Sequence, residues 1–303
     1  RRVKIFDDLK ALIFIVKNLQ KLKPHIVHTH MAKAGALGRL SAALVGVPIR
    51  IHTYHGHLLS GYFRSSLTRL LVLAERSLAK LTTFSIVVGE QVRQDLIEHK
   101  ICSAEKSISI SPGIKPIIRL EKSSSRSQLG LPLDRPIIMF VGRLARIKRP
   151  DIFVELARRF ENHPLRPIFA FVGDGPLADQ LKQESAHLDN VVFSGWHQDL
   201  DVVYSAADIV VLCSDNEGMP LSLIEASSIG VPIIASNVGS VCEIVTDEEN
   251  GLLVEAGNID SFYNSTTRLL ENQSLRQKMS ESKHKSRTDF TFKQSASNHA
   301  AIY

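Results

Sequence analysis

Short apolar runs alternate with longer amphipathic stretches along most of the chain, and this alternation limits the possible folds more than any other feature. In the second half the runs are PIIMFVGR, PIFAFVGDG, VVFSGW, DIVVLCS, PIIASNVG and GLLVE. Segments typical of helices, such as 151–161, 177–188 and 200–206, lie between them. Strands that alternate with helices predict an α/β fold with a parallel, doubly wound sheet.

The first half of the chain repeats this pattern. Its expected strands are HIVHTHM, IRIHTYHG, FSIVVG and SISISPG, and residues 5–23 before them have apolar side chains at helical spacing between lysines. A helix packed on a sheet is the preferred interpretation of 5–23, and a membrane-surface helix is the alternative.

Two such series predict two Rossmann-like domains that face a cleft. We expect a first domain over 1–117, a Ser-rich linker over 118–132, a second domain over 133–280 and a helical tail over 281–303. A length of 303 residues and a hydrophobic content of 44% are sufficient for two cores. In open α/β sheets the ligand lies beyond the carboxyl ends of the strands, so the loops there should hold the site.

Charge and cysteine content narrow the functional classes. The formal charge of +6 and the pI near 9.2 suit an anionic ligand or an anionic membrane surface. The basic residues are spread out and no nucleic-acid signature is present, so we expect no nucleic-acid partner. Three widely separated cysteines form neither a metal-ligand spacing nor a disulfide framework, which favours the cytoplasm. The sequence contains no signal peptide and no run long enough to span a bilayer.

The stretch SDNEGMPLSLIEASSIG, residues 214–230, combines acids with a predicted helix start. Pro220 marks that start and Gly230 the end of the helix, which places Glu217 before the helix and Glu225 inside it. The two carboxylates could be ordinary helix acids, an acid/base pair, or acceptors for the hydroxyl groups of a sugar ligand.

Two further loops carry candidate ligand contacts. Gly142, Arg143 and Lys148 follow one strand, and a guanidinium with an ammonium suits a diphosphate. We expect the neighbouring Arg146 and Arg149 to be solvated loop charges. Gly175 lies in the Gly-rich turn GDGP, which could approach a nucleotide. The chain lacks both the full G-x-G-x-x-G fingerprint and a Walker lysine motif, which argues against redox and nucleotide-hydrolysis functions.

Histidines gather on the first two expected strands. They are His28, His30, His52, His55 and, just beyond, His57. A metal site needs a third ligand that the sequence does not place, and His28 is best interpreted as a core imidazole. His55 stands at a strand end next to Gly56, which is the position of a cleft residue.

In order along the chain, these motifs resemble glycosyltransferase family 4, retaining nucleotide-sugar enzymes with the GT-B fold. The resemblance is carried by HTHMAKAGALGRLSAALVGVP, HTYHGH, VGRLARIK, FVGDGP, SGW, EGMPLSLIEA, PIIASNVGS and NGLLVE. Relative to the family, the chain has SPGIK at 111–115 in place of Asn-Gly-Ile-Asp. It also begins without the first strand and Gly-rich loop, so we expect an incomplete first domain.

The resemblance implies a role for each matching residue. Glu217 would contact the donor sugar near the reacting carbon, and Glu225 would hold the ribose hydroxyls. Arg143 and Lys148 would neutralise the donor diphosphate, and His55 would line the cleft. The turn whose amides approach the diphosphate and sugar matches Gly218, Met219, Pro220 and Leu221.

The implied function is transfer of a hexose, with retention, from a nucleotide sugar such as a UDP-sugar to a cell-surface glycan or lipid-linked acceptor. No metal or other cofactor is expected, and the enzyme would act in the cytoplasm with possible peripheral contact at the inner face of the membrane. Two alternatives remain open. One is a sugar-nucleotide epimerase of the same fold, and the other is a truncated, non-catalytic nucleotide-sugar binder.

Overall fold

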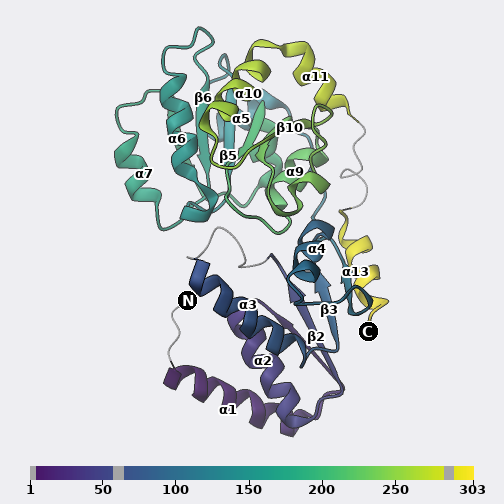
Figure 1. Ribbon diagram of the computed structural model, residues 1–303. Helices are drawn as coiled ribbons and strands as arrows, with labels where there is room; N and C mark the ends of the chain where they lie inside the picture. The colour runs from purple at the N-terminus through teal and green to yellow at the C-terminus, as the bar shows by residue number, and fades with distance from the viewer. Residues whose placement is uncertain (1–4, 57–64, 283–289) are drawn as a thin grey trace. The chain divides into compact units, whose positions relative to one another are not determined.

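The computed structural model describes residues 5–56, 65–282 and 290–303, and the chain divides into two compact units, Arg1–Ser111 and Pro112–Tyr303 (Figure 1). Each unit is built on its own parallel sheet with helices between the strands. The α/β fold with two Rossmann-like domains, predicted from the alternating sequence pattern, is confirmed.

The first unit has a four-stranded parallel sheet in the order β1-β2-β3-β4. Strands that are consecutive in the chain are therefore neighbours, and β1 pairs with β2 so that His30 lies opposite Thr53. The elements are α1 (Ile5–Leu22), β1 (Ile26–His30), α2 (Ala32–Val45), β2 (Ile49–Tyr54), α3 (Ser65–Ala79), β3 (Phe84–Val87), α4 (Glu90–Glu98), η1 (Ala104–Lys106) and β4 (Ser107–Ser109).

A fully buried arginine ties three elements of the first unit together. Arg39 of α2 donates from Nη1 to the Tyr54 hydroxyl of β2 at 3.2 Å. Its Nη2 donates to Glu75 Oε2 of α3 at 2.9 Å. Because a buried guanidinium needs both charge compensation and acceptors, these contacts hold α2 and α3 against β2.

The second unit has a six-stranded parallel sheet in the order β10-β9-β8-β5-β6-β7. The strand order reverses between β5 and β8, where doubly wound sheets open a crevice for ligands. The elements are α5 (Lys122–Gln128), β5 (Ile137–Val141), η2 (Arg146–Lys148), α6 (Pro150–Arg159), β6 (Ile168–Val172), α7 (Ala178–Glu184), β7 (Val191–Gly195), α8 (Leu200–Ala206), β8 (Ile209–Leu212), α9 (Leu221–Ser228), β9 (Ile233–Ser236), η3 (Gly239–Glu243), β10 (Gly251–Val254), α10 (Ile259–Glu271), α11 (Gln273–Glu281) and α13 (Phe292–Ala300).

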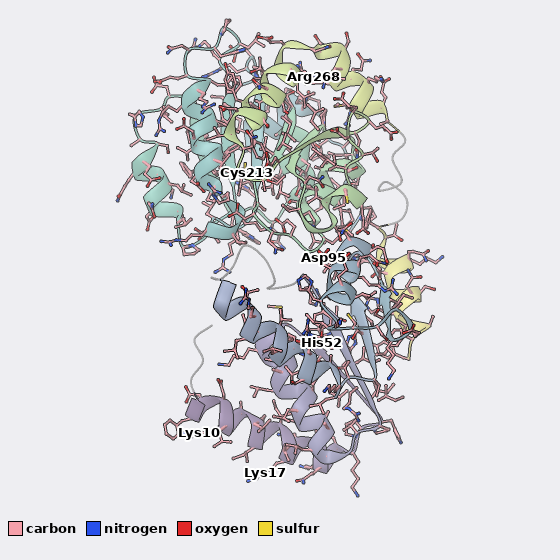
Figure 2. The ribbon with its side chains drawn as sticks, in the orientation of Figure 1. Lys10, Lys17, His52, Asp95, Cys213 and Arg268 are labelled. Atoms are coloured by element: carbon pink, nitrogen blue, oxygen red, sulfur yellow. The ribbon has the colours of Figure 1, made fainter. Side chains whose placement is uncertain are left out.

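Phenylalanines dominate the core of the second unit. The rings of Phe153 on α6 and Phe171 on β6 lie 4.9 Å apart edge to face, and both side chains are fully buried. Cys213, directly after β8, is buried in the same cluster (Figure 2). A dense aromatic core under β5, β6 and β8 gives the loops at their carboxyl ends a rigid base.

The segment 118–132, which we expected to be a linker, is packed into the second unit. It contains helix α5, and Arg126 of this helix is buried. The Arg126 guanidinium donates to Asp208 Oδ2 at 2.5 Å and to the Ala206 carbonyl at 3.2 Å. The Ser-rich composition of 118–132 resembles a linker, but the ion pair between Arg126 and Asp208 anchors this segment at the start of β8.

The expected tail begins where α11 ends and includes α13. Between them, Phe290 accepts a hydrogen bond from the Ile114 amide at 2.9 Å, and Thr291 forms a parallel bridge with Ile114. In the described residues, no helix is both long enough and apolar enough to cross a membrane.

Candidate functional site

Two predicted site residues meet where the strand order reverses in the second unit. Lys148, at the end of η2 after β5, places its Nζ 2.5 Å from Glu217 Oε1, which follows β8. The Ser214 hydroxyl donates to the same oxygen at 2.6 Å. Glu217 is 8% exposed and Ser214 is fully buried. The carboxylate is therefore held between an ammonium and a hydroxyl at the carboxyl ends of the central strands β5 and β8.

A second set of ion pairs fixes the loop that carries Lys148. Arg149 donates from Nη2 to Asp151 at 2.9 Å and from Nη1 to Asp215 at 3.1 Å. The Asp215 amide donates to the Ile147 carbonyl at 2.9 Å, which joins the loops after β5 and β8 directly. The prediction that Arg149 is a solvated loop charge is therefore wrong, because its guanidinium bridges two carboxylates. Asp151, two residues after Arg149, was the sequence signal for this role, whereas Asp215 lies 66 positions away.

Arg143 lies in the same loop, close to the end of β5. It is exposed, and its guanidinium has no hydrogen bond or ion pair among the described residues. Gly142 precedes it in an extended turn, and its amide donates to the Val172 carbonyl of β6 at 2.9 Å. A cationic group held on a fixed backbone is thus available in the loop that also carries Lys148.

Two glycines allow these loops to approach one another closely. A Cβ at Gly175, in the loop after β6, would lie 2.4 Å from the Leu144 carbonyl oxygen. Gly239, after β9, has a φ of +52° and a Cβ there would lie 1.9 Å from the Glu217 carbonyl oxygen. Gly175 therefore supports the loop that carries Arg143, and Gly239 is a supporting position that the sequence did not single out.

The predicted turn, 218–221, leads directly into α9. Pro220 caps the helix, whose first residue is Leu221, one position later than predicted. The Gly218 carbonyl accepts a hydrogen bond from the Ser240 amide of η3 at 3.1 Å. Met219 is buried and Leu221 is exposed. The N-terminus of α9, which favours anions, therefore begins four residues after Glu217.

Glu225, one turn into α9, has a different environment from Glu217. Its Oε2 accepts a 2.6 Å hydrogen bond from the hydroxyl of Tyr204, a buried residue of α8 that we did not predict. Burial raises the pKa of the Glu225 carboxyl, and the Tyr204 hydrogen bond opposes this shift. Glu225 also lines a pocket of about 450 Å³ together with Lys115, Ile117, Gln198, Asp199, Leu200 and Asp201.

In the first unit, His55 lies just after the carboxyl end of β2. Its Nε2 is 3.0 Å from Nδ1 of His30, the last residue of β1. His28 Nε2 lies 2.6 Å from the Thr53 hydroxyl, which agrees with its interpretation as a satisfied imidazole. His57 lies outside the described residues.

His52 is the buried member of this histidine group. Its Nδ1 lies 2.8 Å from the Thr29 hydroxyl. Burial, followed by the positive charge of Arg39 and the neighbouring imidazoles, lowers the pKa of His52 to about 3. This imidazole is therefore neutral at physiological pH. Among the described residues, no three His, Cys, Asp or Glu side chains are grouped so that they could hold a metal ion.

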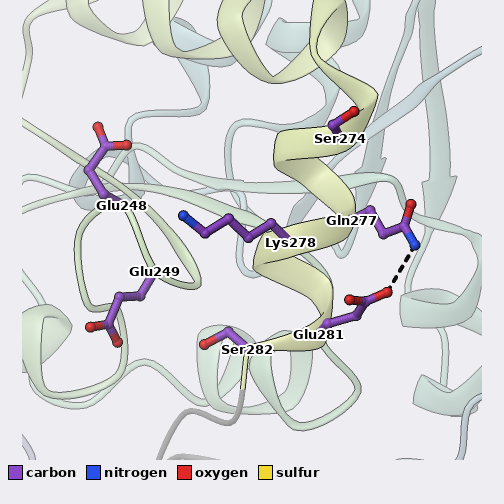
Figure 3. A pocket seen from close by; sticks show the side chains of 7 residues that line it. All are labelled: Glu248, Glu249, Ser274, Gln277, Lys278, Glu281 and Ser282. Atoms are coloured by element: carbon purple, nitrogen blue, oxygen red, sulfur yellow. Dashed lines mark hydrogen bonds between the residues drawn. The ribbon is translucent and has the colours of Figure 1, made fainter.

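A second cavity, also of about 450 Å³, lies away from the predicted residues (Figure 3). Helix α11 and the loop before β10 form it, and Gln277 donates to Glu281 across one of its walls at 2.9 Å. Its lining residues are Glu248, Glu249, Ser274, Gln277, Lys278, Glu281 and Ser282. It contains none of the residues that meet at the end of β8.

Comparison with known families and proteins agrees with this architecture. Residues 4–116 match Glycosyltransferase Family 4, and residues 121–286 match Glycosyl transferases group 1. The UDP-Gal:alpha-D-GlcNAc-diphosphoundecaprenol alpha-1,3-galactosyltransferase of Escherichia coli is 34% identical over 286 residues, which cover 91% of this chain and 74% of the relative. A D-inositol 3-phosphate glycosyltransferase of Corynebacterium aurimucosum is 28% identical over 299 residues, covering 92% of this chain and 71% of the relative.

Solved structures share the fold. Sucrose-phosphate synthase from Thermosynechococcus elongatus aligns with a TM-score of 0.81 at 24% identity, covering 100% of this chain and 79% of the other. HepE of Anabaena in complex with UDP and glucose aligns with a TM-score of 0.83 at 19% identity, covering 100% of this chain and 83% of the other. With its two parallel sheets and both family matches, the chain belongs to glycosyltransferase family 4 and is a hexosyltransferase of the GT-B fold.

Proposed function

We propose that this enzyme moves a hexose from a UDP-sugar to a hydroxyl group of a glycan or lipid-linked acceptor, with retention at the anomeric carbon. The observation that carries the proposal is the Lys148–Glu217 pair at the point where the strand order reverses. The E. coli relative is named for a UDP-Gal donor and a diphosphoundecaprenol-linked acceptor, and the Anabaena protein holds UDP and glucose.

The donor diphosphate is proposed to lie between the loop after β5 and the start of α9. Arg143 supplies two parallel donors for phosphate oxygens, and Lys148 supplies a point charge. The amides at the start of α9, after Pro220, face the same negative charge. These groups stabilise the charge that develops on the leaving diphosphate, so the scheme needs no metal.

The donor sugar is proposed to contact Glu217. Its carboxylate, already fixed by Lys148 and Ser214, accepts hydrogen bonds from the sugar near the reacting carbon. The bond between the anomeric carbon and the diphosphate oxygen breaks, and the acceptor oxygen bonds to that carbon on the same face. The proton of the acceptor hydroxyl passes to the leaving phosphate, which yields UDP and the extended acceptor.

The nucleoside is proposed to occupy the pocket that Glu225 lines. A half-buried carboxylate at its wall suits the adjacent hydroxyls of a ribose, because a carboxylate accepts two hydrogen bonds at once. In the first unit, His55 is the proposed contact to the donor sugar, through an imidazole that His30 already partners.

A lipid-linked acceptor would bring the enzyme to the inner face of the membrane, and α1 has side chains suited to that surface. Phe6 is 82% exposed and Phe14 69% exposed, and Lys10 and Lys17 lie on the same helix (Figure 2). Sedimentation with anionic phospholipid vesicles checks this contact. A Phe6→Ser/Phe14→Ser variant should sediment less than the wild type, and equal sedimentation would contradict it.

The proposed function is tested with a labelled UDP-hexose and a lipid-linked glycan acceptor. We expect Glu217→Gln to reduce transfer about a hundredfold or more while UDP affinity stays within a few-fold. Glu255→Gln is the matched control, because Glu255 also follows a strand of this sheet and is exposed. Full turnover by Glu217→Gln would remove that residue from the site.

The same assay separates the alternatives. Conversion of UDP-GlcNAc to its epimer without any acceptor would indicate the epimerase. UDP binding by calorimetry with no acceptor ever labelled would indicate a binder rather than a transferase.

A further inference from the structure

Tyr204 contacts Glu225 from the core and not from the pocket. The Tyr204 side chain on α8 is fully buried, and it does not line the pocket formed by the described residues. Its hydroxyl lies 2.6 Å from Glu225 Oε2. Glu225 itself is only partly buried and does line the pocket. Tyr204 thus fixes one carboxylate oxygen of Glu225 from the core side, while the Glu225 side chain lines the pocket.

We propose that Tyr204 is a positioning residue that holds Glu225 in the orientation in which its carboxylate accepts hydrogen bonds from the hydroxyl groups of a nucleoside. This inference rests on the proposed function, because it assigns a partner to the residue that would bind the ribose. Tyr204 itself touches no substrate.

The direction of the hydrogen bond follows from the ionisation of the two groups. Burial and the nearby Glu225 charge raise the pKa of Tyr204 far above its usual range, so the phenol keeps its proton and donates it. Glu225 is then an acceptor on both oxygens, and its remaining capacity suits ligand groups that donate. Two adjacent hydroxyls meet that requirement, whereas a phosphate, which has only acceptors at neutral pH, does not.

The phenol also favours the ionised form of Glu225, which forms no ion pair among the described residues. Burial favours the protonated carboxyl, and the hydrogen bond from Tyr204 favours the carboxylate. The other ionisable groups at the pocket are Lys115, Asp199 and Asp201. No ion pair joins Glu225 to Lys115 among the described residues. The hydrogen bond from the neutral Tyr204 hydroxyl is therefore the contact that favours the carboxylate form of Glu225.

The experiment measures binding of UDP and of 2′,3′-dideoxy-UDP by calorimetry to the full chain. The variants are Tyr204→Phe, Glu225→Gln and the control Tyr263→Phe, which removes a hydroxyl from a tyrosine of α10 elsewhere in the same unit. We expect Tyr204→Phe to weaken UDP binding about tenfold, because a hydrogen bond to a charged group is lost. Its affinity for the dideoxy nucleotide should equal that of the wild type.

The pH dependence is a second readout that a purely structural role would not change. Without the phenol the pKa of Glu225 rises further, so UDP affinity should begin to fall at a higher pH in Tyr204→Phe than in the wild type. This difference should be absent for Tyr263→Phe and for the dideoxy nucleotide with any variant.

The outcomes separate this inference from the function on which it rests. If the wild type binds neither nucleotide, the proposed function fails and the inference fails with it. If the wild type prefers UDP to the dideoxy nucleotide but Tyr204→Phe shows the same preference and pH profile, only the inference is overturned. If Tyr204→Phe weakens both nucleotides equally, the tyrosine is structural and the inference is also overturned.

Discussion

The carboxyl ends of the two sheets carry contrasting chemistry. In the second unit, the loops after β5 and β8 are joined by charges, through Lys148 with Glu217 and Arg149 with two aspartates. In the first unit, the ends of β1 and β2 are joined by imidazole and hydroxyl groups, through His30 with His55 and Thr29 with His52.

Under the proposed function, this difference suits two kinds of ligand group. A diphosphate carries negative charge, and cations that are already compensated by carboxylates can accept it with little rearrangement. Sugar and acceptor hydroxyls are neutral, and imidazole and hydroxyl groups can both donate to them and accept from them. The fold supplies the positions at the strand ends, and the side chains decide which ligand group each end suits.

Removing the cation of the charged end should have the largest effect. Lys148→Met leaves the nearly buried Glu217 without its ammonium, so we expect transfer to fall about a hundredfold. The free energy of unfolding should fall by about 1–3 kcal/mol, since Lys148 is partly exposed. The double variant Lys148→Met/Glu217→Gln should recover much of that stability. Lys182→Met, an exposed lysine of α7, is the control, and equal loss of transfer in both would contradict the prediction.

In the first unit, we expect the removal of a charged side chain to lower the free energy of unfolding appreciably only when that side chain lies in the core. Arg39→Leu leaves Glu75 and Tyr54 without the buried guanidinium, and we expect a loss of about 3 kcal/mol in the free energy of unfolding. Denaturant unfolding measures it, and Arg69→Leu, which changes an exposed arginine of the same helix α3, should cost far less. UDP binding, which we place in the second unit, should not change, and its loss would argue against this division of roles.

Acid should affect the strand ends of the first unit through His52. The unfolded chain protonates this imidazole below about pH 6.5, whereas the folded chain resists protonation until the pH reaches about 3. The free energy of unfolding should therefore decrease as the pH falls from 6.5 towards 3, by up to about 1.4 kcal/mol per pH unit from this residue. His52→Asn should show a shallower decrease in urea unfolding measured from pH 7 to pH 5. Identical slopes in the two proteins would show that His52 is not held neutral.

The smallest effect is expected for a charged contact outside both strand ends. Arg268 of α10 (Figure 2) bonds both oxygens of Glu248, at 2.5 and 2.7 Å, but both side chains are about half exposed. Arg268→Ala should change the free energy of unfolding by less than about 1 kcal/mol and leave transfer unchanged. A larger loss would mean that ion pairs stabilise the second unit generally and not mainly at its site.

The sequence predicted the fold well because apolar runs mark buried parallel strands directly. It did not show that Lys148 and Glu217 touch, because that contact requires the β5–β8 pairing, which periodicity does not reveal. The Ser-rich composition of 118–132 concealed the buried Arg126, whose partner Asp208 lies 82 positions away. Tyr204 was missed because a tyrosine in a short apolar helix is typical of a core position. Only the hydrogen bond from its hydroxyl to Glu225 distinguishes it from an ordinary core residue.

The contact between η3 and the turn before α9 also makes the proposed donor site accessible to spectroscopy. All three cysteines lie in the described residues, and only Cys242, on η3, is exposed. Cys213 is buried and Cys102 is partly buried, and burial raises the pKa of all three thiols, that of Cys102 to about 11. Since Ser240 of the same short helix binds the Gly218 carbonyl, a thiol-reactive fluorophore on Cys242 would sit two residues from a direct contact of the proposed donor turn. The natural sequence thus provides an attachment point for an optical sensor of donor binding, without any engineered cysteine.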